Sequence, residues 1–163
     1  MKNLLIIRHA KSNWDNPALS DFDRPLNHRG KNDAPMMAER LIEKGFKPDL
    51  IITSPANRAL STAHYFADAL QYPKDLIEYE ASLYEASVHD WFNLVNKLPE
   101  SASNVIIFGH NPAITYFTKS LCNCRIDNIP TCGMALCKIT EGKWADVKDY
   151  TAELSWFNYP KLI

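Results

Sequence analysis

Four residues of this sequence have side chains that can bind an anion or attack it, and each stands near the end of a short apolar run. The residues are Arg8, His9, Arg58 and His110, and the runs are Leu4–Ile7, Leu50–Ile52 and Val105–Phe108. Guanidinium groups offer paired donors to phosphate oxygens and stay charged at physiological pH. A neutral imidazole presents a nucleophilic nitrogen. These residue types together indicate the chemistry of phosphoryl transfer.

Taken one at a time, these residues have ordinary structural explanations. A histidine after a strand is commonly a polar loop residue, and an arginine in the first turn of a helix is mildly disfavoured by the helix dipole. An anion bound at that helix N-terminus would offset the cost at Arg58. In open α/β sheets the ligand crevice lies beyond the carboxyl ends of the strands. We therefore expect all four side chains to meet at one edge of the sheet.

The chemistry of such a site needs His9 to be neutral. Two nearby arginines would lower the pKa of His9 by charge repulsion, whereas a bound dianion would raise it. A backbone carbonyl that accepts from the second ring nitrogen would fix the tautomer. Positioning and cationic stabilisation carry most of phosphoryl transfer, so we expect no metal and no other cofactor.

The elements that must position these residues follow from the apolar pattern. The three runs are continuous rather than alternating, as in strands of a mostly parallel sheet that is covered on both faces. Four stretches between and after them have helical spacing. The first begins near Lys31, since Pro35 is tolerated in a first turn, and the second has Ser54 as its cap and Pro55 as its first residue. The third is capped by Ser87, and the fourth follows Asn111-Pro112.

The sequence after the fourth helix predicts a C-terminal hairpin. Its strands are expected at Met134 to Thr140 and at Trp144 to Val147, joined by a turn at Glu141-Gly142. Strands that alternate with helices indicate an α/β fold with helices on both faces of the sheet. We find no internal repeat or linker, so residues 1–163 are expected to form one domain.

Composition excludes several functional classes. The 163 residues carry a net charge of -1, which gives no reason to expect nucleic acid as a partner. No apolar run is long enough for a secretory signal or a membrane span, so we expect a cytoplasmic protein that does not bind membranes. The four cysteines, which are Cys122, Cys124, Cys132 and Cys137, are expected to be free thiols. A zinc-binding regulator is a weak alternative, because pairs spaced as C-x₂-C are absent.

The ordered motifs resemble those of a known family. Residues 4–12, with Arg8-His9, resemble the arginine-histidine signature that opens the histidine phosphatase superfamily, which includes phosphoglycerate mutases. Most members have glycine after the histidine, and here Ala10 stands there. Together with the segments 23–30, 54–63, 83–87 and 109–112, this looks more like the short branch of SixA-type phosphohistidine phosphatases. The resemblance implies a phosphoglycerate mutase-like fold.

The resemblance also implies roles for the four pocket residues. His9 corresponds to the nucleophile that becomes phosphorylated. Arg8, Arg58 and His110 correspond to the rest of the phosphate pocket, where His110 would donate to a phosphoryl oxygen in its charged form. The expected activity is a phosphatase that acts through phospho-His9 without a metal.

Two further residues receive weaker assignments from the resemblance. Glu85 lies about where larger members keep a proton donor, although it could equally be a solvated glutamate before a helix. An alkoxide leaving group needs such an acid. Phosphohistidine leaves as imidazole, whose conjugate acid has a pKa near ~6.5, so it can depart without one. Arg24 would add a further cation, while the residues around Arg24 and Gly30 hold the loop.

Three kinds of function remain open at this point. The short chain leaves little room for a large lid, which favours a phosphohistidine in a protein as substrate. A small phosphorylated metabolite is the alternative within the same superfamily. A non-catalytic phosphate-binding module is the alternative from another class, and it would be marked by loss of a pocket residue. The remaining histidines, His28, His64 and His89, are expected to lie away from the crevice.

Overall fold

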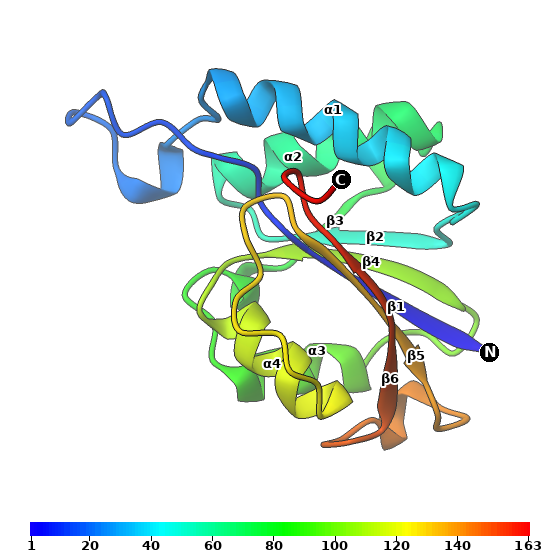
Figure 1. Ribbon diagram of the computed structural model, residues 1–163. Coiled ribbons are helices and arrows are strands. Elements are labelled where there is room, and N and C mark those ends of the chain that lie inside the picture. The colour runs from blue at the N-terminus through cyan, green and yellow to red at the C-terminus, as the bar shows by residue number, and fades with distance from the viewer.

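A single six-stranded sheet forms the centre of the molecule. The computed structural model describes all 163 residues, and Figure 1 shows the sheet between two pairs of helices. The strands are β1 (Lys2–Arg8), β2 (Leu50–Thr53), β3 (Glu78–Tyr79), β4 (Asn104–Gly109), β5 (Met134–Ile139) and β6 (Ala152–Asn158). Their order across the sheet is β3-β2-β4-β1-β5-β6. The first four in that order pair in parallel, while β5 pairs antiparallel with both of its neighbours, β1 and β6.

Four helices cover the two faces of this sheet, as the sequence predicts. They are α1 (His28–Glu43), α2 (Asn57–Leu70), α3 (Val88–Asn96) and α4 (Ala113–Cys122). Helices α1 and α2 lie on one face and α3 and α4 on the other (Figure 1). The side chains of β1 alternate between two separate apolar cores, with Leu4 and Ile6 in one and Leu5 and Ile7 in the other. Both faces of the strand are therefore buried, which explains its unbroken apolar run.

Helix α1 begins earlier than predicted. It starts at His28 rather than near Lys31, because the side chain of Asn27 accepts a hydrogen bond from the backbone N–H of Gly30 at 2.8 Å. Pro35 consequently lies inside the helix. A proline there removes one backbone hydrogen bond, and packing of the apolar face of α1 outweighs that loss.

The start of α2 also differs from the prediction. The helix begins at Asn57, and Ala56 occupies the cap position without a side-chain hydrogen bond. The Ser54 hydroxyl accepts from the N–H of Ala56 at 3.3 Å and does not cap the helix. Ser54 instead lies against a histidine of the candidate site. The predicted cap of α3 is confirmed, since Ser87 forms a capping box with Asp90.

The C-terminal hairpin is confirmed, but its second strand lies later in the sequence than predicted. Strand β5 lies where expected, but Trp144 to Asp146 form a short 3₁₀ helix, and the return strand is β6. Trp144 is fully buried, and its indole N–H donates to the carbonyl of Ala102 at 2.8 Å. Burying this large side chain turns the segment away from β5, so the chain rejoins the sheet only at Ala152.

The loop between β1 and α1 is tied to itself by backbone contacts. The N–H of Asn13 donates to the carbonyl of Pro25 at 2.8 Å, and the N–H of Asn27 donates to the carbonyl of Lys11 at 3.0 Å. Gly30 packs directly on the Lys11 carbonyl and leaves no room for a Cβ atom. These contacts agree with the expectation that the residues around Gly30 hold the loop.

The sequence also leads us to expect free cysteine thiols and no membrane-spanning segment. All four cysteines are free thiols, and Cys137 is buried in β5. No group of three or more His, Cys, Asp or Glu side chains is arranged to hold a metal ion. None of the helices combines the length and the apolar character that crossing a membrane requires.

Candidate active site

His9 stands immediately after β1, with one ring nitrogen committed to the backbone. Its Nδ1 lies 2.7 Å from the carbonyl oxygen of Ala10. Because a carbonyl only accepts, Nδ1 carries the proton and the lone pair is on Nε2. The pKa of His9 is lowered to about 3, chiefly by burial; the charges of His110, Arg58 and Arg8 add to this effect and the Ala10 carbonyl opposes it. His9 is therefore a neutral imidazole with a nucleophilic Nε2 at physiological pH.

The backbone around His9 is held from two sides. The N–H of Ala10 donates to the Thr62 hydroxyl at 2.9 Å, and that hydroxyl donates to the carbonyl of Arg58 at 2.7 Å. On the other side, the N–H of Cys132 lies 3.1 and 3.0 Å from the carbonyls of Arg8 and His9. Ala10 itself is fully buried. The end of β1 is thereby fixed to α2 and to the segment before β5.

The second histidine of the prediction lies beside the first. The ring centroids of His9 and His110 are 5.2 Å apart. His110 is buried at the end of β4, and its Nε2 lies 2.7 Å from the hydroxyl of Ser54 at the end of β2. Burial and then the charge of Arg58 lower its pKa to about 4. His110 is consequently neutral in the absence of a bound anion.

Arg8 and Arg58 lie near the two histidines, and each has an N–H group without a hydrogen-bond acceptor. Arg8 donates through Nη1 to the carbonyl of Ile129 at 3.1 Å. Burial and the nearby charge of Arg58 lower the pKa of Arg8. The Nε atoms of Arg8 and Arg58 are both buried without any hydrogen-bond partner. Buried donors without a partner are costly, and an oxyanion between these side chains would satisfy them.

Asp21, which sequence reasoning did not select, joins the cationic side chains together. Its carboxylate accepts from Nη2 of Arg58 at 3.0 Å, from Nε and Nη2 of Arg24 at 3.1 and 2.9 Å, and from the Tyr84 hydroxyl at 2.7 Å. Its backbone carbonyl also accepts from Nη1 of Arg58 at 2.7 Å. The Tyr84 hydroxyl and the guanidiniums hold the pKa of Asp21 well below its usual range. The one signal in the sequence was the position of an acid three residues before Arg24.

A cavity of about 250 Å³ opens over Asp21, Arg58 and His110, while His9 and Arg8 are not among the residues that line it. It is lined by Asp21, Arg58, Tyr84, Glu85, Ala86, His110, Asn111, Pro112 and Ala113. Glu85 therefore lies at the same cavity as His110, although it is exposed and makes no side-chain hydrogen bond. Arg24 is buried beside the site rather than in the cavity lining, and its guanidinium stacks 3.4 Å above the ring of the exposed Trp14.

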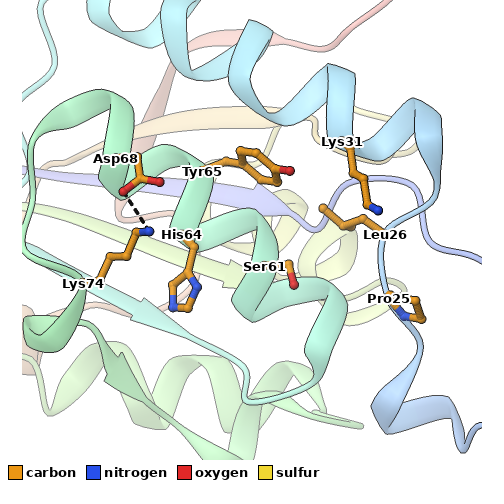
Figure 2. Close-up of a pocket in the computed structure, with 8 residues that line it drawn as sticks. All are labelled: Pro25, Leu26, Lys31, Ser61, His64, Tyr65, Asp68 and Lys74. Atoms are coloured by element: carbon orange, nitrogen blue, oxygen red, sulfur yellow. Dashed lines mark ion pairs between the residues drawn. The ribbon is translucent and has the colours of Figure 1, made fainter.

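A second cavity, of about 290 Å³, is lined mainly by side chains of α2, together with residues from α1, from the loop before α1 and from the segment after α2. Figure 2 shows Lys31 reaching it from α1, His64 from α2, and Lys74 paired with Asp68 at 3.0 Å. None of the expected site residues lines this cavity. His64 thus lies away from the two site histidines, as predicted, and His28 and His89 are exposed.

Comparison with known proteins identifies the family to which this chain belongs. The family model of the histidine phosphatase superfamily (branch 1) matches residues 4–101. A chloroplastic protein of Arabidopsis thaliana without an assigned function is 27% identical over 163 residues, which covers 95% of this chain and 74% of the relative.

Two solved structures share the fold over nearly the whole chain. One is a candidate phosphohistidine phosphatase SixA from Agrobacterium tumefaciens, with a TM-score of 0.83, 25% identity and coverage of 98% of each chain. The other is the protein histidine phosphatase SixA in complex with tungstate, with a TM-score of 0.82, 23% identity and coverage of 97% of each chain. The fold expected from the resemblance is confirmed.

Proposed function

Because this chain belongs to the histidine phosphatase superfamily, we propose that it is a metal-independent phosphatase that passes the phosphoryl group through His9. The observation that carries the proposal is the state of His9. Its Nδ1–H donates to the Ala10 carbonyl, which leaves the lone pair of Nε2 free to attack. The ring of a second histidine, His110, lies close by, with 5.2 Å between the two ring centroids. Such a nucleophile turns one difficult displacement into two easier ones.

The reaction has two displacements at phosphorus. In the first, His9 Nε2 forms a bond to phosphorus while the bond to the leaving group breaks, and the leaving group takes a proton from water or, for an alkoxide, from the carboxyl group of Glu85. In the second, water attacks phospho-His9, the phosphorus–nitrogen bond breaks, and inorganic phosphate is released with neutral His9. The charge that builds on the phosphoryl oxygens is stabilised by Arg8, Arg58 and the ring of His110. These groups supply the stabilisation that a metal would otherwise bring.

The shape of the site supports a phosphohistidine carried by a protein as the substrate. Small-ligand pockets enclose about 300–1,000 Å³, and the cavity here encloses about 250 Å³. A phosphoryl group fits it, while the rest of the substrate remains outside. Glu85 is exposed and has no hydrogen-bond partner that would hold it against a leaving group. Imidazole departs without such an acid, whereas an alkoxide does not.

A small phosphorylated metabolite is the second candidate, and Glu85 at the cavity favours it. If the carboxyl group of Glu85 protonates an alkoxide, alkyl phosphates become substrates as well. Both candidates use the same phospho-His9 intermediate and differ only in the leaving group. A cytoplasmic location belongs to this proposal too, and the four free thiols support a reducing compartment.

The covalent step is tested by replacing His9 with alanine. Turnover of an aryl phosphate should fall to background, and the base-stable, acid-labile phosphoenzyme found on rapid quenching of the wild type should disappear. His89→Ala, which removes an exposed imidazole, should change neither. Aryl phosphate turnover that survives in His9→Ala would rule out the proposed intermediate.

The substrate is tested by comparing wild-type kcat/KM on a histidine-phosphorylated protein with kcat/KM on a panel of phosphorylated metabolites. Glu85→Gln should slow alkyl phosphate hydrolysis at least tenfold more than phosphohistidine hydrolysis, since only the alkoxide needs a proton from an acid. Equal losses on both substrates would contradict the leaving-group argument. A wild-type preference for a metabolite would favour the second candidate.

A further inference from the structure

The buried hydroxyl of Ser54 is the only side-chain partner of His110. We propose that Ser54 is a positioning residue that donates its proton to His110 Nε2, so that neutral His110 keeps a proton on Nδ1 for a phosphoryl oxygen. The inference rests on the proposed function in one respect, which is that the group accepting from the Nδ1–H of His110 is a phosphoryl oxygen. It departs from the charged His110 that the resemblance implies.

The hydrogen bonds around Ser54 decide between two arrangements of protons. Ser54 Oγ accepts from the N–H of Ala56 at 3.3 Å and lies 2.7 Å from His110 Nε2, and it has no other partner. Ser54 is completely buried. If Nε2 carried the proton and donated to Ser54, the hydroxyl proton would have no acceptor.

The surroundings of the other ring nitrogen, Nδ1, also favour the arrangement in which Ser54 donates to Nε2. Nδ1 is buried and has no partner in the protein. With the proton on Nε2, the Ser54 hydroxyl proton and the Nδ1 lone pair would both be buried and unsatisfied. With the proton on Nδ1, only the Nδ1–H is unsatisfied, and a bound oxyanion would satisfy it. Each buried polar group without a partner is unfavourable, so the second arrangement is preferred.

The charges around His110 favour the neutral form of its ring, which the proposed tautomer requires. Arg58 from α2, Arg8 from β1 and Arg24 from the loop before α1 all lower its pKa, and only Asp21 raises it. The neutral ring of His9 lies 5.2 Å away, centroid to centroid. The Tyr84 ring is 5.7 Å away by the same measure, and its hydroxyl proton is donated to Asp21. Glu85 lines the same cavity from the outside.

The consequence is a phosphate site whose histidine donor does not need to be protonated. A neutral imidazole has one N–H, and a fixed tautomer decides which side of the ring presents it. Without the Ser54 hydroxyl, the single proton of neutral His110 is free to move to Nε2, where it faces away from the proposed acceptor. Lowering the pH would restore a donor on both nitrogens.

The tautomer is measured by ¹⁵N NMR on the resting wild type at pH 8, with ¹⁵N-labelled histidine and the signals assigned by the variant His110→Gln. We expect Nδ1 to carry the proton and Nε2 the lone pair. Addition of inorganic phosphate should shift the Nδ1–H signal and leave Nε2 unprotonated. A proton on Nε2, before or after phosphate is added, would overturn the inference. The measurement needs no turnover, so it is separate from the test of phospho-His9.

The positioning role is tested with Ser54→Ala beside the control Thr53→Val. Thr53 is equally buried, and its hydroxyl donates to the Ser54 carbonyl and not to a histidine. Ser54→Ala should lower kcat/KM at pH 8 by about tenfold or more, and the loss should shrink as the pH falls towards the pKa of His110, which is about 4. Thr53→Val should keep the wild-type pH profile. Equal losses in both variants, independent of pH, would mean that the Ser54 hydroxyl is merely structural.

Discussion

The two buried histidines should make the protein unusually sensitive to mild acid. Burial lowers the pKa of His9 to about 3 and that of His110 to about 4, whereas both titrate near ~6.5 in the unfolded chain. Below pH ~6.5 the unfolded chain therefore binds two protons that the folded protein does not. The stability due to these groups is complete above that pH and decreases as the pH falls towards the folded pKa values.

The magnitude follows from the size of the shifts. Between pH 7 and pH 5 each histidine should lower the free energy of unfolding by about 2 kcal/mol, so the pair should lower it by roughly 3–4 kcal/mol. That is a large part of the ~5–15 kcal/mol that stabilises an ordinary domain. Carboxyl groups with lowered pKa values, such as Asp21, contribute only at lower pH.

Urea unfolding at pH 7, 6 and 5 measures this directly, with tryptophan fluorescence as the signal, because Trp91 and Trp144 are fully buried. His9→Gln and His110→Gln should each remove about half of the pH dependence that is due to this pair, since glutamine does not titrate. His89→Gln, at an exposed position, should leave it unchanged. A wild-type loss below about 1 kcal/mol, or an unchanged slope in His9→Gln, would refute the reasoning.

Two substitutions test the support of the site. Asp21→Asn removes the charge that holds the guanidiniums, and a misplaced guanidinium should lower kcat/KM by about 10- to 100-fold. Because the carboxylate of Asp21 is half-exposed, its loss should lower the free energy of unfolding by about 1 kcal/mol or less. Asp23→Asn, which touches neither guanidinium, is the control in steady-state assays, and an unchanged kcat/KM in Asp21→Asn would count against that role. Gly30→Ala should destabilise the protein by about 1–3 kcal/mol in urea unfolding, because the new methyl group meets backbone. Gly142→Ala, with nothing within 4 Å, should be neutral, and equal stabilities of the two variants would show that the loop yields.

Much of the site's location was predictable from the sequence because strand ends converge in an α/β sheet. The apolar runs placed β1, β2 and β4 correctly, and parallel pairing of these strands brings His9, Arg58 and His110 to one edge. The continuous character of the runs also indicated helices on both faces. These inferences depend on local patterns together with a general rule of topology, so they needed no knowledge of particular contacts.

Other features depended on contacts between distant segments, which local patterns do not encode. Trp144 has the spacing of a strand residue, but burial of its ring against Ala102 excludes it from the sheet. Asp21 resembles any loop acid until the fold brings Arg58 and Tyr84 to its carboxylate. The direction of a hydrogen bond is even less visible in sequence.

The residue types in the chain were therefore enough to predict that a phosphoryl group is bound and attacked at the end of β1. Only the tertiary structure decided the state of each group. His9 is neutral because it is buried, and its lone pair is on Nε2 because the Ala10 carbonyl lies 2.7 Å from Nδ1. Protonation and tautomer depend on solvent exclusion and on atoms within hydrogen-bond distance, and both arise only when the chain has folded.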